Sequence, residues 1–500
     1  MTTTADVLPT TSTEQLDERV RAARTGYEQA REVAPRRRAE WLEAIASALE
    51  EHAEELVPLA REESHLATGR LQGELKRTVF QLRLFADEIV GGEHFAATID
   101  HEDPSWGMGP RPDIRRVNVP LGVVGVFGAS NFPFAFSVIG GDSASALAAG
   151  CAVVHKIHEG HQGLGARTGQ IVTEALEAAG APAGLFSTVT GRTAGQALVD
   201  HPLVRAIGFT GSPAGGRALF DRACRRPVPI PFYGELGSVN PVFVTERAWA
   251  ARRDEILAGY ANAATMGMGQ FCTKPGVIVV PAFDVDEVTD VLRRELGTKP
   301  LTALLTPGLR EGFDTALAAV RALPAVDDLI VGDDAEAPRP TVLITTSEDV
   351  RDDATVLERE IFGPATVIIQ YRSEDELEEL ASLLGGQLTA TIQAEPDERL
   401  TGLVSALHAK SGRVLWNSWP TGVTVSYAQH HGGPYPATTA PATTSVGTAS
   451  IGRFMRPVAY QSFPEAQLPS ALREANPWAI ARRVDGHRTR KSNTPEGEAR

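Results

Sequence analysis

Cysteine is scarce in this chain, with three residues among 500, and the three are far apart in sequence. Cys151, Cys224 and Cys272 are too few and too scattered for a disulfide framework. They also lack the paired short spacing of a zinc site. An odd number of cysteines is typical of a reducing compartment, so we expect free thiols in a cytoplasmic protein.

Basic residues are fewer than acidic residues, and the formal net charge is −15. Non-specific nucleic-acid binding requires a basic face, so the composition argues against a nucleic-acid partner. The one basic run, 481–493, ends in polar residues and is interpreted as a solvated, frayed terminus.

No segment is typical of a signal peptide or a membrane span. The N-terminus lacks a basic region followed by an apolar core. Residues 117–141 contain no charge, but Pro120, Asn131, Pro133 and several glycines would break a spanning helix. We interpret this stretch as a buried strand, a turn and the start of a helix, and expect no membrane association.

The length and the pattern of the chain predict an α/β fold. Five hundred residues exceed one hydrophobic core, so two or three packed units are expected. Helical periodicity covers 14–88, and 98–118 is expected to be extended chain or a hairpin leaving the main body. Strands (122–129, 151–157, 185–191, 204–212) then alternate with helices (142–150, 162–182, 193–202), which requires a parallel sheet. A second α/β series spans 236–422, with helices near 248–266, 284–296, 309–322 and 374–385.

Cys272 lies in the glycine-rich turn "MGMGQFCTKPG" (266–276), outside any apolar run. It is either a packed cysteine or a nucleophile, and the turn alone does not decide between them. Asn131 in "GASNFPF" follows a strand and is either a turn former or an amide donor to an oxyanion. Glu235 in "YGELGSVNP" is either a solvated loop charge or a base with a raised pKa.

Other motifs suggest a phosphate-bearing ligand without proving one. "GFTGSPAGG" places Gly211 and Gly216 at the start of a helix, which is a weak phosphate signal. Lys156 and Glu159 end a strand in "VVHKIHEGHQG". The three histidines of that segment are not expected to converge on one ion, so no metal site is predicted. Glu360 and Phe362 in "LEREIFGPATVII" are loop residues or a wall of the site.

Taken together, these motifs resemble the aldehyde dehydrogenase superfamily over nearly the whole chain. Seven occur in family order: Asn131 in "SNFPF", Lys156 in "VVHK", Ser212 in "FTGS", Glu235 in "ELGSVNP", Cys272 in "GQFC", Glu360 with Phe362 in "EIFGP", and Asn417 in "VLWN". The segments 127–150 and 430–469 look like the branch that oxidises 2,5-dioxopentanoate, which also contains NADP-linked fatty aldehyde dehydrogenases.

The resemblance implies a role for each matched residue. Cys272 would attack the aldehyde, Asn131 would stabilise the oxyanion, and Glu235 would activate water to hydrolyse a thioester. The remaining matched positions would bind NAD or NADP: Lys156, Glu159, Gly211, Ser212, Gly216, Glu360 and Phe362. Glu159 would repel a 2′-phosphate, which favours NAD. The glycines near Cys272 would make room for the intermediate and the nicotinamide.

The resemblance also implies two doubly wound parallel-sheet domains and a small oligomerisation arm. The expected parts are a dinucleotide-binding domain (1–97 and 119–236), a catalytic domain (237–430), and an arm with the C-terminal tail (98–118 and 431–500). The arm would include a strand after Phe454 that pairs between subunits, so a homo-dimer or homo-tetramer is expected.

Some alternatives remain open at this point. The substrate is 2,5-dioxopentanoate or a fatty or general aldehyde, and Arg453 and Arg456 are candidates to meet a substrate carboxylate. Lys274 is expected to face solvent, although it would otherwise lower the thiol pKa or bind substrate. A CoA-acylating relative would require CoA. A cofactor-free cysteine esterase needs a histidine near Cys272, and none lies between His201 and His408.

Overall fold

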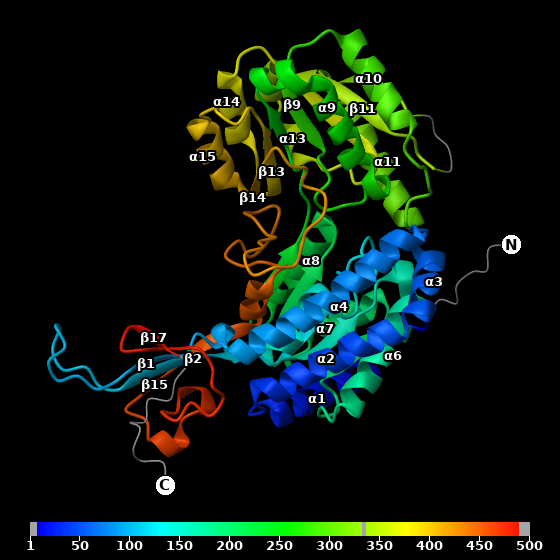
Figure 1. Ribbon diagram of the computed structural model, residues 1–500. Helices are drawn as coiled ribbons and strands as arrows, with labels where there is room; N and C mark the ends of the chain where they lie inside the picture. The colour runs from blue at the N-terminus through cyan, green and yellow to red at the C-terminus, as the bar shows by residue number, and fades with distance from the viewer. Residues whose placement is uncertain (1–7, 333–336, 490–500) are drawn as a thin grey trace.

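Two α/β bodies and a projecting sheet make up the computed structural model, which describes residues 8–332 and 337–489 (Figure 1). Each body has a sheet with helices on both faces, as the alternating sequence pattern predicts. The predicted fold class, with two doubly wound parallel sheets, is confirmed. Within the described residues no helix is long and apolar enough to cross a membrane.

The first sheet has the strand order β5-β4-β3-β6-β7, and all its pairs are parallel. Its strands are rich in branched apolar residues because both faces of a parallel sheet are buried. They are β3 (Val123–Phe127), β4 (Ala152–Lys156), β5 (Phe186–Val189), β6 (Val204–Thr210) and β7 (Phe232–Glu235). The chain reverses its direction of winding between β3 and β6, and such a point is where ligands bind in open sheets.

The predicted helices of this body begin within two residues of the observed ones. The helices are α1 (Thr13–Ala30), α2 (Pro35–Glu51), α3 (Ala53–Ser64), α4 (Thr68–Gly91), α5 (Gly141–Ala149), α6 (Gln162–Ala178), α7 (Arg192–Asp200) and α8 (Pro213–Arg225). The long helix α4 runs across this body toward the second one (Figure 1).

The second sheet has the order β10-β11-β12-β9-β8-β13-β14, in which only the β10–β11 pair is antiparallel. Its strands are β8 (Val242–Val244), β9 (Val277–Pro281), β10 (Asp327–Ile330), β11 (Thr341–Thr346), β12 (Ala365–Tyr371), β13 (Gln387–Gln393) and β14 (Ser411–Trp416). Its helices are α9 (Glu246–Thr265), α10 (Val285–Gly297), α11 (Pro307–Arg321), α12 (Ser347–Asp352), α13 (Thr355–Glu358), α14 (Asp375–Leu383) and α15 (Thr401–Lys410).

The third sheet projects from the body with the order β15-β2-β1-β16-β17 (Figure 1). It contains β1 (Thr98–Asp100) and β2 (Ile114–Pro120), which form the hairpin expected over 98–118. β15 (Met455–Gln461) pairs with β2, and β16 (Arg482–Val484) pairs with β17 (His487–Thr489). The expectation of a frayed basic terminus is therefore wrong for 481–489, because backbone pairing with β1 holds it. Residues 490–493 lie outside the described residues.

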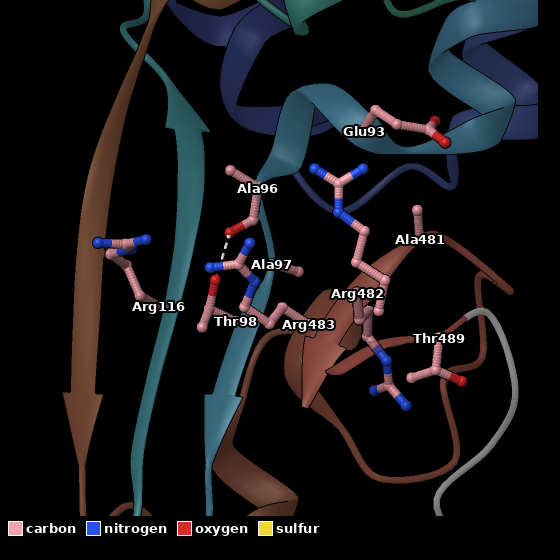
Figure 2. Close-up of a pocket in the computed structure, with 10 residues that line it drawn as sticks. Glu93, Ala96, Ala97, Thr98, Arg116, Ala481, Arg482, Arg483 and Thr489 are labelled. Atoms are coloured by element: carbon pink, nitrogen blue, oxygen red, sulfur yellow. Dashed lines mark hydrogen bonds between the residues drawn. The ribbon is translucent and has the colours of Figure 1, made fainter. Parts of the chain in front are cut away.

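A hollow of about 570 Å³ opens between β1 and the β16–β17 hairpin (Figure 2). Its lining includes Arg116, Arg482, Arg483 and Arg488, together with small residues from 96–98. It lies on the projecting sheet and contains no nucleophile, so it is not a candidate for the chemistry that the sequence predicts. That chemistry lies between the two α/β bodies.

Candidate functional site

Three segments that are distant in sequence meet beside the sulfur of Cys272. Glu235 is the last residue of β7, Cys272 follows η3 (Met266–Gly269) and precedes β9, and His431 lies in the long loop after β14. His431 Nε2 lies 2.9 Å from Glu235 Oε1 and 3.6 Å from Cys272 Sγ. Within the described residues these three side chains also form a possible metal-ligand cluster, with ligand atoms no more than 4.8 Å apart. The absence of a metal remains a prediction.

Backbone hydrogen bonds to the end of β7 position the loop that carries His431. The loop runs beside the end of β7, where Leu236 N donates to Ala437 O at 2.9 Å and Thr439 N donates to Gly234 O at 3.0 Å. The backbone N–H of His431 donates to Thr444 Oγ1 at 2.8 Å. Sequence reasoning missed His431, because it stands in a polar loop 159 residues from Cys272. The doublet "HH" within that loop was the only available signal.

Glu235 is buried and stays ionised. Burial by itself would raise the pKa of this carboxyl, but the His431 charge and hydrogen bonds from His431, Ser445 and Cys272 lower it below its usual value. Ser445 Oγ donates to Glu235 Oε2 at 2.8 Å. The solvated-charge interpretation is therefore wrong, and so is the expected raised pKa. The sequence does not show the donors that surround the carboxylate.

Cys272 is a neutral thiol at rest. Loss of solvent around the sulfur raises the pKa of the Cys272 thiol well above its usual value, and the charges of Glu235 and Glu360 raise it further. The charge of Arg413 acts in the opposite direction. An ionised carboxylate within hydrogen-bond reach of a thiol is an arrangement in which the proton can leave the sulfur at the moment of attack.

The glycines before Cys272 allow two segments to approach each other. Gly267, Met268 and Gly269 all have positive φ, a backbone conformation that favours glycine. A Cβ atom on Gly269 would lie 2.2 Å from the carbonyl oxygen of Gly363. This observation differs from the prediction that the glycines leave room for a ligand, since the space at Gly269 is filled by the 360–365 loop.

Asn131 lies beside the nucleophile turn, where the sequence placed it. The side-chain Nδ2 of Asn131 donates to the backbone oxygen of Gln270 at 3.0 Å. The backbone oxygen of Asn131 accepts a hydrogen bond from Arg70 Nη2 at 2.6 Å. The neighbouring Glu74 accepts from the backbone N–H groups of Phe134 and Ala135 at 2.8 and 3.0 Å. The segment that carries Asn131 is therefore fixed by two charged residues of α4.

Lys274 is buried, so the prediction that it faces solvent is wrong. Its Nζ donates to the carbonyl oxygens of Ile361, Gly363 and Ala365 at 2.5, 3.2 and 2.7 Å. Burial lowers the pKa of Lys274 and raises that of the carboxyl of Glu360, and each charge partly offsets the shift of the other. Lys274 thus clamps the loop that carries Glu360 and Phe362 against the nucleophile turn.

Of the predicted dinucleotide residues, Lys156, Glu159, Gly211 and Ser212 lie at the carboxyl edge of the first sheet, whereas Glu360 and Phe362 precede β12 of the second. Lys156 ends β4, and its Nζ lies 3.6 Å from Oε1 of the exposed Glu159.

Ser212 follows β6 and caps α8, its Oγ accepting from Gly215 N at 3.3 Å. Residues 212–214 at the start of α8 are exposed, but Pro213 has no N–H and the amide of Gly216 donates to Ser212 O at 2.9 Å. An anion here would therefore have to compete with the Ser212 cap for the Gly215 amide.

Gly211 and Gly216 pack against apolar side chains. A Cβ atom on Gly216 would lie 2.1 Å from Leu236 Cδ2, and one on Gly211 would lie 2.8 Å from the ring of Phe209. Both positions therefore allow α8 to pack closely on the sheet. Close helix packing next to a phosphate-binding turn is one established use of glycine in dinucleotide folds.

His155, His161 and Asn417, which belong to other sequence motifs, have partners outside the Cys272 cluster. His155 Nδ1 lies 3.1 Å from Ser143 Oγ, and His161 Nε2 lies 3.1 Å from Ala129 O, so these rings have separate partners. Asn417 accepts from Arg252 and from the backbone of Ala394, which ties β14 to the end of β13.

The two arginines expected to meet a substrate carboxylate do not lie in the site. Arg453 is buried in an ion pair with Asp142, and its guanidinium lies 5.5 Å from the ring centroid of Tyr233. Arg456 is exposed on β15. Both are therefore wrong as carboxylate-binding candidates, because one already has a buried anionic partner and the other lies on the projecting sheet.

The structure combines two α/β sheets with a buried cluster in which Cys272 lies beside Glu235 and His431. Comparison with known proteins agrees: residues 2–308 and 331–434 match the model of the Aldehyde dehydrogenase family. The chain belongs to the aldehyde dehydrogenase family, and it is an oxidoreductase that converts an aldehyde into a carboxylic acid with NAD or NADP.

Two relatives are similar to this chain over most of its length. The chain is 43% identical to alpha-ketoglutaric semialdehyde dehydrogenase 2 of Azospirillum brasilense, over 90% of this chain and 87% of that one. It is 38% identical to alpha-ketoglutaric semialdehyde dehydrogenase of Acinetobacter baylyi, over 95% and 91% of the two chains.

Solved structures support the fold. An aldehyde dehydrogenase C mutant of Pseudomonas syringae with NAD+ and octanal superposes with a TM-score of 0.75 at 22% identity, covering 91% of this chain and 90% of that one. Glyceraldehyde-3-phosphate dehydrogenase GapN of Methanocaldococcus jannaschii, complexed with NADP, gives 0.77 at 19% identity, over 91% and 95%.

Alkylation of Cys272 should be slow at neutral pH. Because the thiol pKa is raised, the thiolate fraction is small at pH 7 and grows as the pH rises toward that pKa. In a Cys224→Ser background, which removes the exposed thiol, the iodoacetamide rate should increase through the alkaline range without a plateau below pH 9. A plateau near neutral pH would contradict the neutral resting thiol.

Replacing Lys274 with methionine should destabilise the protein by about 2–3 kcal/mol, because three buried carbonyl groups lose their donor. Thermal unfolding should show the apparent Tm falling by several degrees. Lys76→Met on the exposed face of α4 is the matched control and should leave the Tm unchanged. Equal Tm values for the two variants would refute the clamp.

Proposed function

We propose that this enzyme oxidises 2,5-dioxopentanoate to 2-oxoglutarate. The observation that supports this substrate most directly is the extent of similarity to two alpha-ketoglutaric semialdehyde dehydrogenases, which spans at least 90% of this chain. Phe132, Phe136 and Phe271 form a chain of ring contacts that reaches His431, the neighbour of Cys272, and such an aromatic wall suits a small aldehyde.

The proposed mechanism uses each residue of the site in turn. The Cys272 sulfur adds to the aldehyde carbon as its proton passes to the Glu235–His431 pair. The Asn131 amide and the backbone N–H of Cys272 stabilise the oxyanion of the thiohemiacetal. Loss of hydride to the bound dinucleotide would leave a thioester, and the pair would release the thiol proton to solvent. Glu235, ionised again, would then take a proton from the water that hydrolyses the thioester and return it to the departing sulfur. The product is a free acid and the thiol is restored.

The residues at the edge of the first sheet fit a dinucleotide. The exposed N-terminus of α8, capped by Ser212, suits a pyrophosphate, and the Lys156 and Glu159 side chains suit a ribose with two hydroxyl groups. Glu360 and Phe362 are proposed to contact the nicotinamide ribose. When bound, the nicotinamide supplies the hydride acceptor. Because Glu159 would face a 2′-phosphate with like charge, NAD is the proposed cofactor.

A homo-oligomer is proposed from the exposed sheet edges. β14 ends the seven-stranded sheet and β15 ends the projecting sheet, so both have unpaired edges within the described residues. Val414 and Trp416 on β14 are each 40% exposed. Pairing of β15 of one copy with β14 of another would cover these side chains. The three free thiols support a reducing compartment, and we propose the cytoplasm.

Steady-state assays with NAD and NADP should test the function directly. The wild-type enzyme should prefer 2,5-dioxopentanoate to hexanal and NAD to NADP. Cys272→Ser should lower kcat by at least about 10³-fold. Glu235→Gln should lower it about 10²–10⁴-fold, because both the proton transfer from Cys272 and thioester hydrolysis lose the carboxylate. A burst of about one NADH per site should remain, because His431 still accepts the thiol proton and hydrolysis is the step slowed more. No preference for the keto acid would defeat the proposed substrate.

The His431 contact favours a second candidate, a cofactor-free cysteine esterase. The sequence argument against it was that no histidine lies near Cys272, and that argument is wrong because His431 Nε2 lies 3.6 Å from the sulfur. Ester hydrolysis without dinucleotide, together with no aldehyde-dependent NADH formation, would support the esterase. A requirement for CoA would instead indicate an acylating enzyme.

Light scattering during gel filtration should show a mass well above the 53.4 kDa of one chain. Trp416→Glu should shift the mass toward one chain, because a charge on the exposed face of β14 opposes strand pairing. Phe80→Glu, which changes another exposed aromatic residue, is the control and should not alter the mass. A wild-type mass equal to one chain would refute the proposed pairing.

A further inference from the structure

A keto acid brings a carboxylate into the site, and a buried carboxylate needs a cationic partner. Arg453 is paired with Asp142, and Arg456 lies on the projecting sheet. Two other arginines meet at the loop that follows β14: Arg77 on α4 and Arg413 on β14. Burial lowers the pKa of both guanidinium groups, and the charge of Cys272 acts in the opposite direction. The two arginines come from different α/β bodies.

Arg77 reaches this place from the first body. Its Nε donates to Val423 O at 3.1 Å, and its guanidinium lies 5.1 Å from the ring centroid of Phe136. The Phe136 ring is 6.4 Å from the ring of His431, which itself contacts Cys272. The Nη1 and Nη2 atoms of Arg77 are buried and have no hydrogen-bond partner among the described residues.

Arg413 reaches the same loop from the second body. Its Nη2 donates to Pro420 O at 2.8 Å and its Nη1 donates to Gly422 O at 3.4 Å. Its Nε is buried and, in the part of the chain that the structure describes, has no acceptor. The two arginines therefore hold neighbouring carbonyl groups of 420–423 and keep buried N–H groups unsatisfied.

Unsatisfied buried N–H groups are unfavourable, and a guanidinium is shaped to bind a carboxylate through two parallel hydrogen bonds. Arg70, on the same helix as Arg77, has different hydrogen-bond and ring partners. It donates to Asn131 O at 2.6 Å and lies 5.0 and 4.7 Å from the ring centroids of Phe132 and Phe271. Nε and Nη1 of Arg70 are also buried without a hydrogen-bond partner among the described residues, but its guanidinium lies against the two rings and supports the Asn131 segment. Arg77 and Arg413 differ in meeting at the 420–423 loop.

We propose that Arg77 and Arg413 form a carboxylate-binding subsite, which holds the acid end of an oxo-acid substrate while its aldehyde end faces Cys272. This assignment rests on the proposed keto-acid substrate. A neutral aldehyde of similar length leaves both guanidinium groups unpaired, so it binds less tightly. The subsite selects the substrate without taking part in bond making or breaking.

The test compares a charged with a neutral aldehyde in Arg77→Gln and Arg413→Gln. Each substitution should lower kcat/KM for 2,5-dioxopentanoate about 10- to 100-fold, mainly through KM, because a charge-assisted hydrogen bond is lost. The kcat/KM for hexanal should stay within about threefold of wild type. Glutarate, a dicarboxylate without an aldehyde, should inhibit wild type and inhibit both variants more weakly. Arg83→Gln, an exposed ion-pair residue on α4, is the control and should match wild type.

The possible outcomes separate the two proposals. Equal losses for the keto acid and hexanal would show that the arginines only hold the 420–423 loop, and this would overturn the subsite. A wild-type enzyme without preference for the keto acid would instead refute the proposed substrate. If Arg77→Gln does not fold, Arg77→Lys keeps the charge but loses the bidentate geometry, and it should still weaken keto-acid binding selectively. Unchanged selectivity in that variant would also overturn the subsite.

Discussion

The site depends on one buried carboxylate that remains charged. Burial alone would favour the neutral form of Glu235, but His431 and Ser445 surround it with hydrogen bonds and reverse the direction of its pKa shift. Holding that charge requires the loop after β14 to lie against the end of β7, so the electrostatics of the site and the path of the chain are linked. Burial of the sulfur raises the pKa of the Cys272 thiol, and the charge of Glu235 raises it further.

The buried side chain of Lys274 fixes the loop on the other side of Cys272. Lys274 donates to three carbonyl groups of the 361–365 segment, and the absence of a side chain at Gly269 lets that segment approach the turn. The position of the sulfur is thus set by backbone contacts on one side and by Glu235 with His431 on the other. Contacts on two sides hold the Cys272 side chain in place, and a fixed position reduces the reorganisation that a reaction at that atom requires.

Much of the fold could be predicted from the sequence, because the periods of strands and helices are local signals. Asn131, Glu235 and Cys272 were found in short motifs, and the structure brings Glu235 to the sulfur and Asn131 to the neighbouring turn. His431, Arg77 and Arg413 were missed because their significance arises only when distant segments meet. Lys274 was assigned to solvent because lysine is usually exposed, and no local pattern shows the three carbonyl groups that it satisfies.

The loop between β14 and the helical turn η4 (Thr448–Phe454) supplies several unrelated parts of the site. It provides His431 and Ser445 for Glu235 and the carbonyl groups that Arg77 and Arg413 hold. None of these positions belongs to a strand of the two large sheets. Insertions or exchanges in this one segment can therefore alter which molecules are accepted while the scaffold keeps its stability, and selection for new substrates in a lineage would act first on this segment.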